Sequence, residues 1–476
     1  DGVGEALAKK IETLHRTGTL ELLERLRASH PPGLVALAQI PDVGPKKAAA
    51  LHAALGISSV AELEAACRAG RVRGVKGFGE RTEAKILEGI ARMRSRGQRV
   101  LLAEALEVGE RIVAHLRASR ACLRCELAGS TRRGRETVND LDVVAATEEP
   151  AALAEHFLAF PVVAETIARG DTKTSVRLGS GLQVDLRMVP PGDYATLLHH
   201  FTGSKAHHVK LRGRARDLGY TLSEWGLHRL PPRERKEPVR PEPVEGRPPA
   251  EPPPGSEKVP IESEEALYRT LGLPFVPPEL REDQGELEAA EAGTLPDDLV
   301  RLEDVRGLVH AHTLYSDGRA TVEEMARGAE ALGMSYLTIT DHSGTASYAG
   351  GLDEDRLKRQ WDEIARVQEL VPNVRLLRGT ESDILEHGAL DWPDRVLERF
   401  DVIVASIHSR MKMDEDQMTR RLVRAMELPV FKIWGHALGR LLNERDPFAC
   451  RVEEVLDALA RSRGAVEVNG DPRRLD

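Results

Sequence analysis

The chain shows two patterns of hydrophobic and polar positions, on either side of a run of prolines. After about residue 300, short apolar runs such as SYLTITDH and DVIVASIH alternate with stretches at helical spacing such as VEEMARGAEALG and VEEVLDALARS. This alternation predicts βα units around a parallel sheet or barrel. Before residue 230, glycine-led helical stretches come first, followed by apolar runs that contain isolated acids, LDVVAAT and LQVDLRMV. We therefore expect the two halves to fold as different domains.

The first hundred residues repeat one pattern three times. GVGEALAKKIETL from Gly2, DVGPKKAAALHAAL from Asp42 and GFGERTEAKILEGI from Gly77 each place glycine in a turn ahead of a helix. Such a turn exposes backbone N–H groups at the helix N-terminus, where anions bind. The pattern resembles the helix-hairpin-helix motif, which holds DNA phosphates without reading sequence. Asp42 stands where the motif usually has glycine. The expected DNA contacts are Gly44, Lys46, Lys47, Gly77, Gly79 and Arg81, with Lys76 close by.

A proline-rich segment separates the two halves. Residues 231–260 contain 11 prolines, and proline removes backbone donors and stiffens the chain, so an extended linker is expected. Residues 1–230 have a net charge of +7 and the remainder −16. This asymmetry indicates a basic half that meets a polyanion, with chance variation in solvated surface as the alternative.

Composition sets the broader limits. A length of 476 residues indicates about three domains. No apolar run approaches the roughly 20 residues that a membrane helix needs, so no membrane contact is expected. The four cysteines indicate a reducing compartment, here the cytoplasm at the nucleoid. Cys122 and Cys125 form a CxxC without a second pair nearby and are taken as ordinary thiols. No GxxxxGK[ST] motif occurs, which argues against an ATPase motor.

Three acids interrupt apolar runs in the basic half. Asp140 and Asp142 lie two residues apart, so a strand would place both on one face, where they repel unless cations intervene. Asp185 interrupts a second run. Three converging acids suit two-metal nucleotidyl transfer, with Ser130 and Arg133 holding a triphosphate. The alternative is that each acid pairs with a neighbouring arginine; for the set together, we favour the metal site.

GSTRRGRETVNDLDVV, QVDLR and FTGSKAHHVKLRGRARDLGYTLSEWGL resemble the palm and thumb of the family X DNA polymerases. The resemblance covers residues 1–230 almost continuously. It implies a nucleotidyltransferase palm in which Asp140, Asp142 and Asp185 bind Mg²⁺ or Mn²⁺ and Asp185 is also the general base. The implied nucleotide contacts are Gly129, Ser130, Arg133, Phe201, Gly203, Lys205, His208 and Arg212, the last near the template.

Three positions depart from that family. His200 replaces a common tyrosine, His208 replaces an asparagine that usually contacts the incoming base pair, and Asn139 replaces a glycine. These departures bear on sugar discrimination and fidelity more than on the chemistry.

Histidines gather at predicted strand ends in the acidic half. Parallel strands of a barrel bring their C-terminal ends to one face, where imidazole and carboxylate suit Zn²⁺ or Mn²⁺. One such histidine would more often be structural, but five at successive strand ends indicate a metal site. The candidate ligands are His310, His312, Asp317, His342, Glu381, His408 and His436.

These residues resemble a PHP (polymerase and histidinol phosphatase) domain, a barrel with a trinuclear metal site that hydrolyses phosphoesters. Bacterial family X polymerases typically carry this domain after the thumb. The resemblance implies metal-assisted 3′–5′ exonuclease activity, with abasic-site or 3′-phosphate processing as further options. Asp341, next to His342, is expected to support the ligands from outside. Helices before Gly2 and a final Asp-x-His pair after Asp476 are missing relative to the family, so a fragment cut at both ends is expected.

The sequence as a whole predicts a multidomain protein with a helical region, an α+β palm and an α/β PHP barrel. Its expected activity is gap filling in base excision repair by a monomer that uses DNA and dNTPs. One alternative is a catalytically impaired fragment that binds gapped DNA; another is a phosphoesterase that works through the PHP domain alone. The expected domains are helix-hairpin-helix 1–97, palm 98–190, thumb 191–230, linker and connecting segment 231–300, and PHP 301–476.

Overall fold

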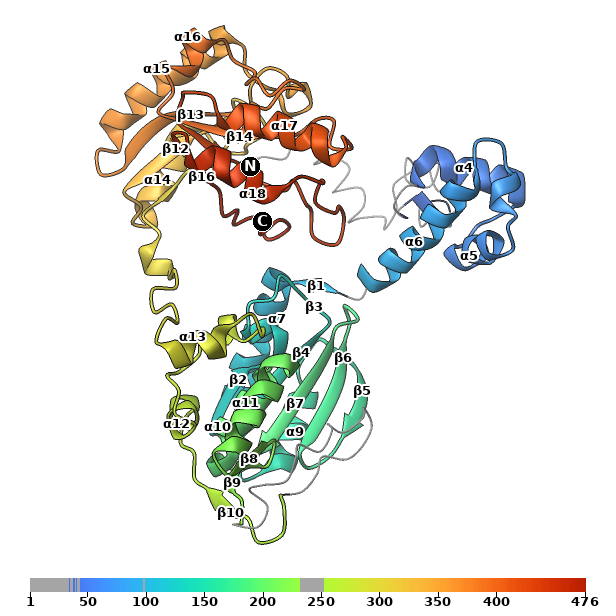
Figure 1. The fold of residues 1–476 in the computed structure, drawn as a ribbon, viewed down its shortest axis with the longest axis vertical. Coiled ribbons are helices and arrows are strands. Elements are labelled where there is room, and N and C mark those ends of the chain that lie inside the picture. Colours follow the sequence, from blue (N-terminus) through green and yellow to red (C-terminus); the bar gives the residue numbers. More distant parts are fainter. Residues whose placement is uncertain (1–33, 35–36, 39, 41–42, 97–98, 232–251) are drawn as a thin grey trace, which may run out of the picture. The chain divides into compact units, whose positions relative to one another are not determined.

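The computed structural model describes residues 34, 37–38, 40, 43–96, 99–231 and 252–476. These residues divide into two compact units, 1–99 and 100–476, and Figure 1 shows their elements. Each unit is considered by itself. Among the described residues, no helix is long and apolar enough to span a membrane.

The first unit is helical and contains the second and third glycine-led repeats. Gly44 and Gly77 adopt φ of +53° and +90°, which explains the glycine at both turns. Buried Leu51, Leu63 and Ile86 are part of the core that joins the helices. The first repeat, from Gly2, and Asp42 lie outside the described residues. The helices are α4 (Gly44–Leu55), α5 (Val60–Arg68), η1 (Val72–Gly74) and α6 (Glu80–Arg96).

A five-stranded sheet forms the palm, with strand order β2-β4-β7-β6-β5. β4 and β7 are parallel and the other neighbours are antiparallel. β1 and β3 form a separate antiparallel pair. The elements are β1 (Val100–Leu101), α7 (Leu102–Arg117), β2 (Arg124–Leu127), α8 (Gly129–Arg132), β3 (Thr137–Val138), β4 (Asp140–Ala146), α9 (Pro150–Leu158), β5 (Val163–Arg169), β6 (Lys173–Leu178) and β7 (Gln183–Val189).

The alternation along β4 determines where the acids point. Leu141, Val143 and Ala145 belong to the core cluster that includes residues of α7 and α9. Val144 belongs to a second cluster with α10, on the other face of the sheet. Because successive side chains of a strand point to opposite faces, Asp140 and Asp142 share the face of Val144.

The thumb is larger than the expected 191–230. Residues after the proline run fold back onto it, because β10 pairs with β9 and buried Leu267 and Tyr268 join the cluster of Leu211 and Leu222. The elements are η2 (Pro191–Asp193), α10 (Tyr194–Thr202), α11 (Lys205–Asp217), β8 (Tyr220–Ser223), β9 (Gly226–Arg229), β10 (Glu257–Val259), α12 (Glu264–Thr270), η3 (Pro278–Leu280) and α13 (Glu286–Ala292).

Buried ion pairs attach this returning segment, which proline content alone did not predict. Fully buried Arg281 donates to Glu264 at 2.6 Å, and Arg132 of α8 donates to the other oxygen of Glu264 at 2.6 Å. His207 of α11 contacts Glu286 at 2.5 Å. Breaking a buried pair leaves an uncompensated charge, so these contacts hold the segment in one register.

The PHP region has a six-stranded parallel sheet with strands in sequence order. In the described residues β16 does not pair with β11, so the parallel sheet curls into a half-barrel without closing. The elements are η4 (Leu302–Asp304), β11 (Gly307–Leu308), α14 (Val322–Ala331), β12 (Tyr336–Ile339), η5 (Ser347–Ala349), α15 (Glu354–Leu370), β13 (Arg375–Asp383), α16 (Asp394–Leu397), β14 (Val402–Ser406), α17 (Glu415–Met426), β15 (Lys432–Trp434), α18 (Val452–Ala460) and β16 (Gly464–Val466).

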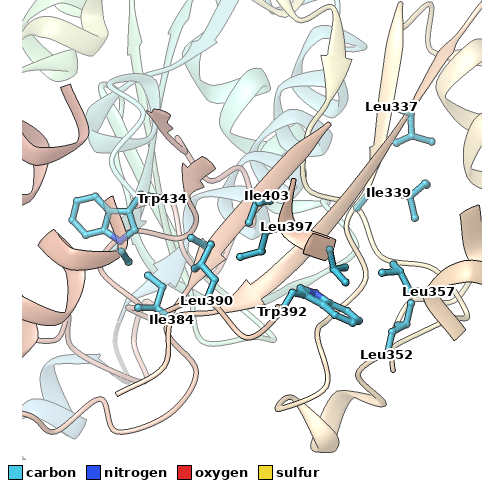
Figure 2. Packing of buried hydrophobic residues seen from close by; sticks show 14 of the residues in the cluster. Leu337, Ile339, Leu352, Leu357, Ile384, Leu390, Trp392, Leu397, Ile403 and Trp434 are labelled. Atoms are coloured by element: carbon cyan, nitrogen blue, oxygen red, sulfur yellow. The ribbon is translucent and has the colours of Figure 1, made fainter. Parts of the chain in front are cut away.

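Apolar side chains from these strands and helices form one core, part of which Figure 2 shows. Leu337 and Ile403 come from strands and Leu357 from α15. Trp392 adds a polar anchor, because its indole N–H donates to Thr380 at 3.0 Å. Thr380 precedes Glu381 in β13, so the core holds the strand firmly where the candidate metal site begins.

Candidate active sites

The structure brings the three predicted palm acids onto neighbouring strands. Asp142 of β4 lies directly beside Asp185 of β7 in the parallel ladder, and Asp140 lies beside Gln183. Paired residues of adjacent strands point to the same face, so all three carboxylates share one face of the sheet. The spacing of two residues in β4 is thus the local cause of the cluster.

The cluster brings like charges close together. Burial raises the pKa of Asp142 to about 7, and repulsion from Asp140 and Asp185 adds to this. Asp185 differs because the Lys173 ammonium lies 2.6 Å away. Although burial acts in the other direction, hydrogen bonds from Lys173 and neighbours hold the pKa of Asp185 below its usual value. Sequence reasoning missed Lys173. It lies in the alternating run KTSVRL, which could have been predicted as a strand with Lys173 on one face.

Gly129 leaves room for the acids. A Cβ atom there would lie 2.2 Å from Oδ2 of Asp142, and its φ is +60°. The glycine is therefore needed for both conformation and space. Three crowded carboxylates, one of them with a strongly raised pKa, form a donor set that fits hard divalent cations such as Mg²⁺ or Mn²⁺.

A cavity of about 390 Å³ opens beside the acids. Its lining includes all eight predicted nucleotide contacts together with Asp140 and Asp142, whereas Asp185 is not part of it. The chain thus brings a helix start, a strand and the thumb helices to one cavity. The lining residues are Gly129, Ser130, Arg133, Asp140, Asp142, His200, Phe201, Gly203, Ser204, Lys205, His208 and Arg212.

Arg133 is held in place by two contacts. Its Nε donates to Glu282 at 2.7 Å and its Nη1 donates to the carbonyl of Thr202 at 2.5 Å. Glu282 comes from the segment after the proline run, so local sequence offered no signal for this pairing.

The two histidines of the cavity are neutral near neutral pH. Burial lowers the pKa of His200 to about 4, with help from Arg212 and Arg187. Burial likewise lowers the pKa of His208, which is 6% exposed. Neither ring nitrogen of His208 has a hydrogen-bond partner among the described residues. Both ring nitrogens are buried, although His208 is part of the cavity lining.

The candidate DNA contacts of the first unit lie at its surface. Lys46 and Lys47 are exposed at the start of α4, and Lys76 and Arg81 are exposed around the turn at Gly77. Gly79 follows in the same exposed loop. Backbone N–H groups at helix starts and nearby cations together suit phosphate.

Glu381 is the centre of the second site. Five histidine nitrogens surround its two oxygens at 2.8 to 3.4 Å, and Asp317 contacts two of those histidines. The structure therefore brings all seven predicted ligands together. The histidines are His310, His312, His342, His408 and His436.

Protons on imidazole balance the buried carboxylate. Although burial opposes it, hydrogen bonds with Glu381 raise the pKa of His310 to about 10, and contacts with Asp383 and Glu381 raise that of His408 to about 9. Burial alone would raise the pKa of Glu381, yet these histidines hold it well below its usual value. Burial lowers the pKa of His312 to about 4.

This donor set fits metal ions. Three groups each place three ligand atoms within 4.8 Å of one another: His310, His312 and Glu381; His312, Asp317 and His342; and His342, Glu381 and His408. Imidazole with carboxylate suits Zn²⁺ or Mn²⁺.

Further acids orient the ligands, as metal sites require. Asp383 accepts from Nδ1 of His408 at 2.5 Å, and Glu467 accepts from Nδ1 of His310 at 2.7 Å. Asp341 accepts from Thr313, Ser316 and Gln360, none of which is a candidate ligand, so its expected support of the ligands stays a prediction. Sequence reasoning missed Asp383 and Glu467. Asp383 lies two residues after Glu381, the same spacing as Asp140 and Asp142, and Glu467 interrupts an apolar run. Both residues could therefore have been predicted as site residues from the sequence.

Comparisons with known proteins identify the families that these regions resemble. Family models match residues 34–92 as a SAM-like helix-hairpin-helix tandem, 197–282 as a DNA polymerase beta thumb and 309–471 as a PHP domain. The "DNA polymerase/3′-5′ exonuclease PolX" of Bacillus subtilis is 35% identical over 477 residues, which cover 100% of this chain and 79% of that protein.

Two weaker matches cover parts of the chain. A probable phosphatase of Caldanaerobacter subterraneus is 30% identical over 34% of this chain and 60% of its own length. A solved polymerase beta of Leishmania infantum, in a ternary P/T complex, is 22% identical with a TM-score of 0.34, covering 53% of this chain and 99% of that one.

Proposed function

Since the chain belongs to the bacterial family X DNA polymerases that carry a PHP domain, we propose that it extends and trims DNA 3′ ends. The palm adds dNTPs to a primer on gapped DNA, and the PHP domain removes nucleotides in the 3′–5′ direction. The proposal includes base excision repair at the nucleoid, by a monomer. The carboxylate cluster beside a cavity lined by phosphate-binding residues is the observation that supports polymerisation most directly.

Each palm residue has a defined task in this proposal. Asp140, Asp142 and Asp185 would hold Mg²⁺ or Mn²⁺, which supply charge for the attacking and leaving oxygens. Ser130 and Arg133 bind the triphosphate, and Gly129 lets it approach the acids. Asp185, kept ionised by Lys173 at 2.6 Å, accepts the proton of the primer 3′-hydroxyl.

The cavity wall orients the nucleotide. Phe201, Gly203 and Lys205 border the sugar and phosphates, and Arg212 lies toward the template. His208 lines the same cavity and lies toward the base pair. A neutral imidazole can both donate and accept, so His208 can take over the task of an amide side chain.

The PHP residues would hold Zn²⁺ or Mn²⁺, which supply water activation and charge neutralisation at a phosphoester. His310 and His408 are kept in one orientation by Glu467 and Asp383. Glu381, at the centre, keeps the imidazoles converged before metal arrives.

A pair of variants tests both assignments. Asp140→Asn with Asp142→Asn should reduce primer extension on gapped DNA by about 10³-fold or more while 3′ trimming continues. His310→Ala with His312→Ala should have the opposite effect. Asp171→Asn and His387→Ala change exposed residues of the same types in the same regions and serve as matched controls.

Undiminished extension by the double Asn variant would overturn the palm assignment. Trimming that persists in the double His variant would place the nuclease elsewhere. Release of phosphate from nucleotides faster than from DNA ends would favour the alternative of a small-molecule phosphoesterase.

The exposed lysines of the first unit provide a separate test of DNA holding. Lys46→Glu with Arg81→Glu should raise the KM for gapped DNA and make the salt dependence of binding shallower, because two phosphate contacts are lost. Unchanged affinity and salt slope would remove this unit from the DNA-binding surface.

A further inference from the structure

A single exposed aromatic ring stands beside the PHP cluster and is not accounted for by metal binding. Tyr348 is 70% exposed, although it lies in η5, six residues after the buried His342. Its ring centroid is 6.2 Å from the rings of both His342 and His408. The interplanar angles are 61° and 67°, so neither imidazole is stacked parallel on the tyrosine.

The loop that carries Tyr348 is held firmly. The backbone N–H of Leu352 donates to the carbonyl of His342 at 2.8 Å. Arg356 donates to the carbonyls of Gly350 and Gly351 at 2.7 and 3.1 Å. A Cβ atom at Gly351 would lie 1.9 Å from the carbonyl oxygen of Ser343, so the loop approaches β12's end closely. The exposed ring is therefore pre-positioned by its backbone.

A tyrosine at a protein surface needs no special explanation by itself. Two observations favour a role here. Its loop is fixed against the candidate metal site, and its ring touches two candidate ligands while most of its surface stays in solvent. An aromatic ring of this kind offers a platform for a nucleobase, and stacking of bases on aromatic side chains is a general mode of single-strand binding.

We propose that Tyr348 binds the terminal nucleobase of a DNA 3′ end by stacking, while the phosphodiester beside it lies against the His342 and His408 side of the cluster. This inference rests on the proposed phosphoesterase function. Tyr348 is a positioning and specificity residue, since it contacts the base and not the reacting atoms.

The proposal has a consequence for substrate choice. A base stacked on Tyr348 cannot remain stacked and paired in a duplex, so it must first be unpaired. Unpairing costs least for single-stranded or mismatched ends. The PHP site therefore selects unpaired 3′ ends, which are the ends that primer extension uses poorly.

Kinetics on matched substrates test this inference. Tyr348→Ala should lower kcat/KM for degradation of a single-stranded oligonucleotide by about 10- to 100-fold, mainly through KM. Tyr348→Phe, which keeps the ring, should stay near the wild type. On an oligonucleotide whose 3′-terminal sugar lacks a base, wild type and Tyr348→Ala should be equally active. Phe431→Ala removes another exposed aromatic from the same region, before β15, as a control.

A binding measurement shows the stack directly and needs no turnover. An oligonucleotide with 3′-terminal 2-aminopurine and a phosphorothioate last linkage should lose fluorescence on binding wild type or Tyr348→Phe. It should lose less on binding Tyr348→Ala. Metal content and primer extension of Tyr348→Ala should match the wild type, which controls for folding.

The outcomes separate this inference from the function on which it rests. If the wild type degrades no DNA, the proposed exonuclease fails. If the wild type degrades DNA and Tyr348→Ala degrades it equally well, the stacking role fails alone. Should Tyr348→Ala not fold, a wild type that removes a base-lacking terminus as fast as a normal one would overturn the inference without it.

Discussion

The palm cluster and the PHP cluster are built from the same sequence pattern but differ in charge state. Each places two acids two residues apart in a strand beside a parallel neighbour: Asp140 and Asp142 in β4, Glu381 and Asp383 in β13. In the palm, the acids repel one another and burial raises the pKa of Asp142 to about 7. In the PHP region, protonated histidines hold the pKa of Glu381 well below its usual value.

The two sites therefore make different demands on a cation. The palm brings carboxylates close together, so a bound cation would relieve a repulsion that the fold has imposed. The PHP cluster is balanced by protons, so a metal must displace them from His310 and His408 before it binds. Removing one carboxylate should therefore have opposite effects on the two regions.

The largest effect is expected for Glu381→Gln. Glu381 is 1% exposed and contacts five histidines. Losing its charge leaves His310 and His408 with one carboxylate partner each instead of two. In metal-free protein at pH 7 we expect the free energy of unfolding of the PHP region to fall by about 3–5 kcal/mol. Urea unfolding followed by tryptophan fluorescence measures this, because Trp361, Trp392 and Trp434 lie in this core.

Glutamine is nearly the same shape as glutamate, so an unchanged unfolding midpoint would mean that the histidines are neutral without metal. The contrast with the palm would then disappear.

Asp142→Asn should act in the opposite direction. The folded-state pKa of Asp142 is raised from 3.8 to about 7, so ionisation costs stability as pH rises from about 4 to 7 and the cost is complete above that. At pH 8 without metal, the variant should be more stable by about 1–3 kcal/mol. The gain should shrink toward pH 4 and be lost when Mg²⁺ is added.

Hydrogen exchange of β4 amides reports this stability locally. At pH 8 we expect the β4 amides to exchange more slowly in Asp142→Asn than in the wild type. Slower exchange in the wild type, or a gain that persists at pH 4, would show that the acids do not repel as the geometry implies.

Asp383→Asn sharpens the comparison within the PHP region. Asp383 accepts from His408 and so fixes which nitrogen faces Glu381. Its loss should weaken metal affinity about 10- to 100-fold with primer extension unchanged. Metal titration measures it, and Asp401→Asn changes an acid near the start of β14 as a control. If Asp383→Asn and Asp401→Asn bind metal with equal affinity, Asp383 does not orient His408.

The smallest effect is expected for Lys173→Gln. Lys173 helps to lower the pKa of Asp185, so without it Asp185 protonates at higher pH. The acid limb of the primer-extension profile should shift upward by about one unit, with a loss of up to tenfold at the most acidic pH of the limb and little loss at pH 8.5. Arg177→Gln, in the same strand, is the control. If the pH profiles of wild type and Lys173→Gln superimpose, Lys173 does not lower the pKa of Asp185.

Much of both sites could be predicted from local pattern. A strand turns residues i and i+2 to one face, so Asp140 with Asp142 follows from alternation, and strand ends gather the histidines at one edge. The same rules applied again would have found Asp383 and Glu467. The partners Glu282 of Arg133 and Glu264 of Arg132 could not be found this way, because they return from beyond 30 residues of proline-rich chain.

The acid spacing, the glycines of the helix-leading turns, the helical region and the alternation of PHP strands and helices follow from the sequence alone, because these depend on neighbouring residues. Only the tertiary structure decided the charge state of the sites. Whether an acid meets a lysine, an imidazole or another acid depends on which strands lie side by side and how deeply they are buried. The open sheet, the enlarged thumb and the exposed ring of Tyr348 above the cluster also arise from long-range packing, which local pattern does not encode.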